Sequence, residues 1–241
     1  HAKNDIPSLL KSYAKRTGLV IEYGRELGIN SLMIGAAGGR VQEAINENSS
    51  FPLDETLLVV VGRGSSDPDA NSNVSKITRM LVEGLGMGWG ETLFSGVTFP
   101  LVEPGLKYLV RLGFKRIIIF PYFLFSGVLV NRIMESTKKI AKENPEIEFI
   151  YSSYLSSHPL VVETFIERID EVLIGDNSMN CLLCKYRSKL LGFEEEVGLA
   201  QQSHHDHVEG IQDEQDQLHG HVHSHFPYPH SDHPLGPVTL R

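Results

Sequence analysis

The sequence predicts an α/β fold with a doubly wound parallel sheet, and three observations support this prediction. The first is residues 116–124, an almost continuous apolar run rich in β-branched and aromatic residues, which is typical of a strand buried on both faces of a parallel sheet. The second is Gly127, which separates this run from a helical pattern, as expected at the carboxyl edge of an open sheet, where ligands bind. The third is the regular alternation of strand and helix patterns from residue 56 onward.

The first 55 residues predict a helix, a short strand and a second helix before a polar linker. Asn4 or Asp5 can cap the first helix, and Pro7 suits its first turn. Ile34 and Val41 belong to the apolar, helically spaced face of the second helix. The expected ranges are 4–16, 20–23, 31–46 and 47–55, in that order.

Four strands and four helices are expected in the part that follows. The strands are expected at 57–61, 93–99, 116–124 and 148–154. The first of the four helices is expected to have Val74, Ile77, Leu81 and Leu85 on one face. The other three are expected from Pro104 to Gly113, at 131–143 and at 160–173. Strands and helices at this spacing indicate parallel βαβ units.

The chain also contains an internal repeat. Asn4, Ile6 and Ala14-Lys15 align with Asn131, Ile133 and Ala141-Lys142, and after a one-residue gap Leu27 and Leu32 align with Leu155 and Leu160. A repeat at a fixed offset predicts duplicated structural units. We therefore expect residues 1–50 to be the C-terminal half of a first module, of which the beginning is missing here, and residues 56–175 to be a complete second module.

Composition limits the classes of function. A chain of 241 residues with 41% hydrophobic residues can bury a sizeable core. A net charge of -8 without a basic stripe argues against nucleic acid as a partner. No apolar run approaches the roughly 18 residues of a membrane span, and no signal peptide is visible. Two cysteines three residues apart suit a metal or redox site better than a disulfide framework, so we expect a cytoplasmic protein.

Two C-terminal segments have the composition of metal ligands. In the segment 176–198, Cys181 and Cys184 form a C-x-x-C pair that can chelate zinc or iron, although a complete site needs four ligands and hence a homodimer or nearby histidines. The alternative is two ordinary cysteines on a terminal helix. The segment 199–241 is a low-complexity, histidine-rich tail that we expect to be disordered. Its candidate ligands for cobalt, nickel, copper or zinc are His204, His205, His207, His219, His221, His223 and His225. An inert tail is the alternative.

Three further positions allow both a functional and a structural interpretation. The turn at 62–68 is either a phosphate cradle at a helix N-terminus or a plain tight βα turn. His1, at a predicted strand-to-helix edge, is either a metal ligand or base, or neither. His158, next to Pro159, is expected to cap a helix or to lie on the surface.

Several motifs resemble those of the sirohydrochlorin chelatases. Gly-Arg-Gly-Ser-Ser-Asp-Pro at 62–68 resembles the Gly-His-Gly-Ser-Arg-Asp-Pro turn of this family. His-Ala-Lys-Asn-Asp-Ile-Pro at 1–7 is similar to a segment of the long cobaltochelatase branch of these class II tetrapyrrole chelatases. Glu103-Pro104, the Met-x-Cys-x-x-Cys motif at 179–184 and the histidine-rich tail also fit. The resemblance covers essentially the whole chain.

The resemblance implies two chelatase-like modules that face each other across a cleft for a tetrapyrrole. It also implies that two histidines of the first module carry out the chemistry. Only one of them, His1, is present in this sequence, and its implied role is that of metal ligand and catalytic base. Arg63 and Val128 occupy the equivalent positions of the second module, which therefore resembles a non-catalytic wall of the cleft. Lys3, Arg63 and Arg132 are candidate ligands of the substrate carboxylates, or else solvated surface charges.

The expected function is that of a sirohydrochlorin cobaltochelatase, a lyase that inserts Co²⁺ into a tetrapyrrole for cobalamin biosynthesis. A neutral imidazole can hold the ion and accept a pyrrole proton near neutral pH. One alternative is insertion of Fe²⁺ for sirohaem. Another is a non-catalytic protein that stores cobalt or nickel through the tail. An iron–sulfur cluster shared by two chains is a further expectation for the cysteine pair.

Overall fold

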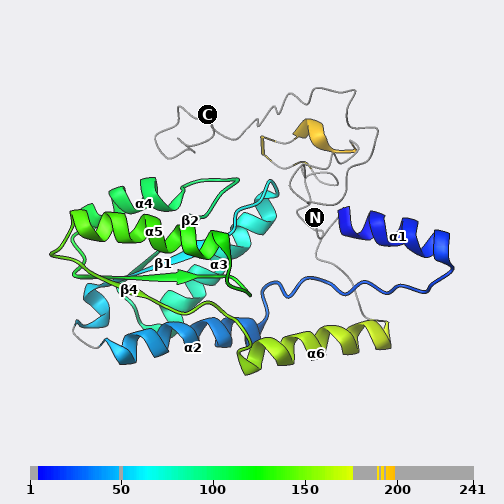
Figure 1. The fold of residues 1–241 in the computed structure, drawn as a ribbon, viewed down its shortest axis with the longest axis horizontal. Coiled ribbons are helices and arrows are strands. Elements are labelled where there is room, and N and C mark those ends of the chain that lie inside the picture. Colours follow the sequence, from blue (N-terminus) through cyan, green and yellow to red (C-terminus); the bar gives the residue numbers. More distant parts are fainter. Residues whose placement is uncertain (1–4, 49–50, 176–188, 190, 193, 199–241) are drawn as a thin grey trace. The chain divides into compact units, whose positions relative to one another are not determined.

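The computed structural model describes residues 5–48, 51–175, 189, 191–192 and 194–198 (Figure 1). The chain divides into two compact units, and the larger contains the described residues from Leu27 to Gly175. The described residues 5–26 and 189–198 belong to the other unit. Among the described helices, none is both long and apolar enough to cross a membrane.

The larger unit is built on a parallel four-stranded sheet with the strand order β2-β1-β3-β4. The strands are β1 (Thr56–Gly62), β2 (Trp89–Phe94), β3 (Arg116–Pro121) and β4 (Glu148–Tyr151). Every residue of β1 and β3 is buried. This burial explains their continuous apolar sequences, because helices cover both faces of a central parallel strand.

Alternate residues of the central strands face two separate core clusters. Leu58 and Ile118 lie in a cluster with residues of α2 (Ser31–Glu47), α3 (Pro68–Leu85) and α6 (Pro159–Ile174). Leu57 and Ile117 lie in the other cluster, with residues of α4 (Val102–Leu109) and α5 (Val128–Glu143). Helices therefore cover both faces of the sheet, and the prediction of a doubly wound parallel sheet is confirmed.

The arrangement of the helices fixes a topological switch point between β1 and β3. These strands are neighbours in the sheet, but β1 leads into α3 on one face and β3 leads into α5 on the other. The connecting loops consequently separate at the carboxyl edge. Open α/β sheets bind their ligands in this position.

Several predicted boundaries were wrong by a few residues, and one predicted strand was wrong altogether. β2 begins at Trp89, because it pairs from there with β1, and it ends before Val97, whose φ of 66° is incompatible with a strand. β3 and β4 each end three residues before the predicted position, at Pro121 and Tyr151. Residues 20–23 form no strand: their backbone pairs with none of the described strands, and Val20 is 88% exposed.

The first helix of the chain, α1 (Asp5–Thr17), confirms the prediction of a helix at 4–16. Ile6, Leu9 and Tyr13 give it an apolar but exposed face. Its last turn is basic, with Lys15 and Arg16, and the guanidinium of Arg16 lies 5.2 Å from the ring centroid of Tyr13. In the described part of 176–198, the structure has one 3₁₀ turn, Glu194–Glu196.

Candidate functional site at the carboxyl edge of the sheet

The loop from β1 to α3 is held rigidly at the switch point. The side-chain amide of Asn71 accepts a hydrogen bond from the backbone N–H of Ser65 (2.9 Å) and donates one to the backbone carbonyl oxygen of Ser65 (2.8 Å). Asp67 caps α3 by accepting a hydrogen bond from the backbone N–H of Asp69 (3.1 Å). The loop backbone therefore has a fixed shape, and it presents the exposed side chain of Arg63.

The same loop approaches the loop from β2 to α4 very closely. Gly64 has a φ of +88°, and a Cβ atom at this position would lie 1.8 Å from the carbonyl oxygen of Gly96. The hydroxyl of Ser95 donates a hydrogen bond to the carbonyl oxygen of Arg63 (3.0 Å). Only glycine at position 64 permits this contact, and it joins the ends of β1 and β2 into one surface.

This geometry favours a tight βα turn over a phosphate cradle. Asp67 accepts from a backbone N–H of the first turn of α3, and Asp69 brings a second carboxylate to the same turn. Two carboxylates at the helix N-terminus occupy the place of a bound phosphate, and their negative charge would repel it.

Exposed apolar side chains lie in the loops that follow β2 and β3 and in the first turn of α5. Phe125 is 74% exposed in the loop after β3, and Val128 is 73% exposed in the first turn of α5. Val97, in the loop after β2, is 58% exposed. Arg132 is exposed and follows Val128 by four residues, so that both lie on one face of α5. The edge thus combines apolar surface with two cations, Arg63 and Arg132.

Tyr122, directly after β3, is a half-buried residue with a buried hydroxyl that sequence reasoning missed. Its hydroxyl has no hydrogen-bond partner among the described residues, and burial raises its pKa to about 12. The ring packs edge to face on Phe120, with centroids 6.1 Å apart. In the sequence, Tyr122 lies within the apolar run 116–124, and nothing in that pattern indicates where a phenol oxygen would lie.

The other predicted residues divide into one confirmed position and a group that the structure does not describe. Nδ1 of His158 accepts a hydrogen bond from the backbone N–H of Leu160 (3.2 Å), which confirms the predicted helix cap. Outside the described residues lie His1, Lys3, Cys181, Cys184 and the tail ligands His204, His205, His207, His219, His221, His223 and His225. The described part of the chain contains no group of three or more His, Cys, Asp or Glu side chains that could hold a metal ion.

Comparisons with known proteins agree with this fold. The sequence model of the CbiX family matches residues 57–172. The chain is 39% identical over 198 residues to the sirohydrochlorin cobaltochelatase of Priestia megaterium, which covers 82% of this chain and 63% of the relative. It is 31% identical over 172 residues to the sirohydrochlorin ferrochelatase of Bacillus subtilis (strain 168), covering 71% of this chain and 63% of the relative. The chain thus spans just under two thirds of the length of these curated relatives.

A solved structure shows the same architecture. The chain superposes on SirB from Bacillus subtilis with Fe³⁺ with a TM-score of 0.60 and 30% sequence identity, covering 74% of this chain and 69% of that one. The parallel sheet, the helices on both of its faces and the sequence identity all lead to the same assignment. The chain belongs to the CbiX family of sirohydrochlorin chelatases.

Proposed function

We propose that this chain takes part in the insertion of Co²⁺ into sirohydrochlorin, as a cobaltochelatase of cobalamin biosynthesis. The observation that carries the proposal is the 39% identity to a sirohydrochlorin cobaltochelatase over 198 residues. Identity to the Bacillus subtilis ferrochelatase is lower, at 31% over 172 residues. This difference favours cobalt over iron, which remains the alternative metal.

The carboxyl edge of the sheet suits one face of a planar tetrapyrrole. A macrocycle has an apolar face, for which Phe125 and Val128 offer exposed apolar surface. Its peripheral carboxylates need cations, and the guanidinium groups of Arg63 and Arg132 are exposed at the same edge. The locked loops hold this surface in place before the substrate arrives.

The second module contributes binding rather than proton transfer. Insertion of a divalent ion releases two pyrrole protons and involves no electron transfer, so the reaction needs a base but no oxidant. Val128 and Arg63 occupy the positions where the family resemblance implies histidines, and neither side chain can accept a proton at neutral pH. We assign the roles of metal ligand and base to His1, and carboxylate binding to Lys3.

The C-terminal segments supply two finer proposals. We propose that Cys181 and Cys184 bind an iron–sulfur cluster together with the same pair of a second chain, because one chain offers only two thiolates. We also propose that the histidine tail collects Co²⁺ for the reaction. The cytoplasmic location expected from the cysteine usage stays a prediction.

The test is a spectroscopic chelation assay. The absorbance of sirohydrochlorin is followed after addition of Co²⁺, with the 241-residue chain and with the protein isolated from its natural source. Arg63→Ala and Arg132→Ala should each raise KM about fivefold and leave kcat nearly unchanged, because each removes one partly solvated ion pair of about 1 kcal/mol. Arg79→Ala is the control, since this exposed arginine of α3 pairs with Glu83.

The outcomes separate the possible roles of the chain. In whichever of the two proteins accelerates the insertion of Co²⁺ into sirohydrochlorin, His1→Ala should abolish most of that acceleration, because it removes the proposed base. Unchanged rates in His1→Ala would exclude that role. Equal KM values for Arg63→Ala, Arg132→Ala and Arg79→Ala would exclude the proposed binding surface. Binding of Co²⁺ without any acceleration would favour the storage protein.

A further inference from the structure

We propose that Val97 is a substrate-contacting residue, held in a strained turn so that its side chain meets the apolar face of the tetrapyrrole beside Arg63. The proposal rests on the function proposed above and adds to it a contact from the loop after β2. Three observations carry it, namely the backbone conformation of Val97, the contacts that fix this conformation and the exposure of the side chain.

The backbone of Val97 has a conformation that β-branched residues rarely adopt. Its φ is 66°, and the backbone N–H of Thr98 donates a hydrogen bond to the carbonyl oxygen of Gly96 (2.8 Å). A hydrogen bond that spans a single residue of positive φ defines the rare and strained form of the γ-turn. Glycine would remove this strain, whereas the branched Cβ atom of valine increases it.

Backbone hydrogen bonds on both sides of the turn hold it in this conformation. Before the turn, the N–H of Ser95 donates a hydrogen bond to the carbonyl oxygen of Gly62 (2.9 Å). The N–H of Phe94 donates one to the carbonyl oxygen of Pro100 (2.9 Å), which closes the loop at its base. The close approach to Gly64 fixes the turn from the side of the neighbouring loop. Strained residues persist where the surrounding structure determines their conformation in this way.

Burial of the Val97 side chain does not offset this strain. Val97 is 58% exposed, and it belongs to neither of the two core clusters of the described residues. The structure thus keeps a strained residue in place and directs an apolar side chain into solvent at the carboxyl edge of the sheet. Strain of this kind is concentrated at ligand-binding sites, where it fixes a side chain before the ligand arrives.

The neighbourhood of Val97 matches the chemistry of a tetrapyrrole, which has an apolar ring face bordered by carboxylates. The hydroxyl of Ser95 binds the carbonyl oxygen of Arg63, so the two loops bring an apolar side chain and a cation to the same part of the edge. The methyl groups of Val97 then contact the ring, and the guanidinium of Arg63 binds a carboxylate at its border. Because the turn is locked and a valine side chain is stiff at χ1, little conformational freedom is lost on binding.

Two substitutions of Val97 separate the strain from the side chain. Val97→Gly removes both, whereas Val97→Ala removes the two methyl groups and keeps a Cβ atom at positive φ. We expect Val97→Gly to raise Tm of the 241-residue chain by about 2–4 °C, and Val97→Ala to raise it by less. Both should raise Kd for sirohydrochlorin about fivefold, measured by fluorescence titration in the absence of metal. A gain in stability together with a loss of affinity is the result expected of a residue retained for binding.

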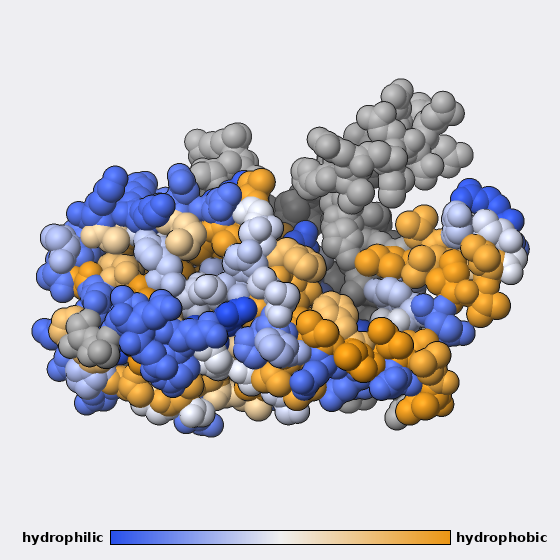
Figure 2. Space-filling view, turned by 60° about the horizontal axis from the view of Figure 1, so that its bottom comes forward, coloured by the Kyte–Doolittle hydropathy of each residue, from blue (hydrophilic) through white to orange (hydrophobic). Residues whose placement is uncertain are grey.

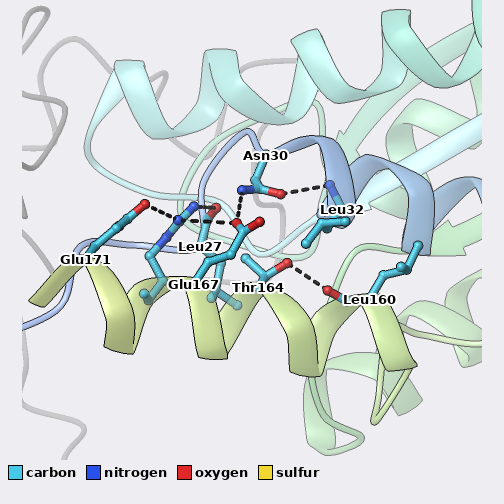
Figure 3. Close-up of polar contacts among 8 residues, drawn as sticks. Leu27, Asn30, Leu32, Leu160, Thr164, Glu167 and Glu171 are labelled. Carbon is cyan, nitrogen blue, oxygen red and sulfur yellow. Dashed lines mark hydrogen bonds and ion pairs between the residues drawn. The ribbon is translucent and has the colours of Figure 1, made fainter. Parts of the chain in front are cut away.

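Ile169→Ala is the matched control, because an apolar ring could also adsorb to another apolar surface. Ile169 is likewise 58% exposed, and it lies on α6, over which Figure 2 shows an apolar area. Polar contacts keep α6 in place in this variant. The side-chain amide of Asn30 donates a hydrogen bond to the carboxylate of Glu167 (2.8 Å; Figure 3), and Arg168 donates one to the carbonyl oxygen of Leu27 (3.1 Å). We therefore expect Ile169→Ala to leave Kd for sirohydrochlorin unchanged.

The outcomes distinguish the role of Val97 from the proposed function. An unchanged Kd in both Val97 variants, with weaker binding by Arg63→Ala, would overturn the contact and leave the proposed function standing. An unchanged Kd in Arg63→Ala as well, or no binding of sirohydrochlorin at all, would contradict the proposed binding surface itself. A loss of affinity in Ile169→Ala as large as that in Val97→Ala would place the ring on α6 and refute the contact. A lower Tm in Val97→Gly would show that the side chain stabilises the fold and is not held under strain for binding.

Discussion

Gly64→Ala tests whether the close approach of two loops stabilises the sheet unit and shapes the proposed site. The substitution has two separate costs. Alanine at a φ of +88° costs about 1 kcal/mol relative to glycine. The new Cβ would also lie 1.8 Å from the carbonyl oxygen of Gly96, and moving that backbone costs a further 1–3 kcal/mol or so. We therefore expect a loss of about 3 kcal/mol and a decrease in Tm of about 6–12 °C.

Gly113→Ala is the matched control, because it has only the first cost. Gly113 has a similar φ of +82°, but nothing lies within 4 Å of the position of its Cβ. Its expected loss is about 1 kcal/mol, or about 2–4 °C in Tm. The assay is thermal and guanidinium unfolding of both variants, followed by far-UV circular dichroism. Equal losses in the two variants would show that the contact between Gly64 and Gly96 contributes nothing.

Three further substitutions or deletions have defined outcomes. Tyr122→Phe should stabilise the chain by up to about 1 kcal/mol in guanidinium unfolding, because it removes a buried hydroxyl that has no partner among the described residues; a clear loss of stability would reveal a missed partner. Hydrogen bonds from Lys139 and then Lys107 lower the pKa of Glu103. The stabilising effect of this carboxylate, at most about 1 kcal/mol, should therefore be present at pH 7 and lost as the pH falls through the lowered pKa. Glu103→Gln should abolish that pH dependence, and an unchanged profile would contradict the ion pairs. Deletion after Gln202 should leave Tm unchanged but lower the number of Co²⁺ ions bound, with binding in the intact chain weakening below about pH 6.5; a large decrease in Tm would show that the tail belongs to the fold.

Local sequence patterns were sufficient to predict the fold class, because β1 and β3 are buried on both faces. Their apolar runs could be recognised without knowing which strands pair. The cap at His158 was predictable for a similar reason, since it depends only on neighbouring residues and on Pro159. Such features are determined within a few residues of the chain.

Features that depend on distant residues were not predictable in this way. The start of β2 at Trp89 is set by pairing with Leu57, and its sequence alone does not show that partner. The need for glycine at position 64 comes from Gly96, which lies 32 residues later in the chain. That the hydroxyl of Tyr122 has no hydrogen-bond partner in the described part of the chain likewise depends on what surrounds it in three dimensions.

The residues that stabilise the fold and those of the proposed site are largely different residues in the described part of the chain. The backbone of the site is fixed by buried or half-buried groups, such as Asn71 and Gly64, which determine where the loops lie. The side chains that face the proposed substrate, Arg63, Phe125 and Val128, are exposed and contribute little to the core. Substitution of these exposed residues should therefore alter binding without unfolding the chain. A change in KM for Arg63→Ala can then be attributed to the lost contact with substrate, whereas any effect of Gly64→Ala on activity has to be corrected for its loss of stability.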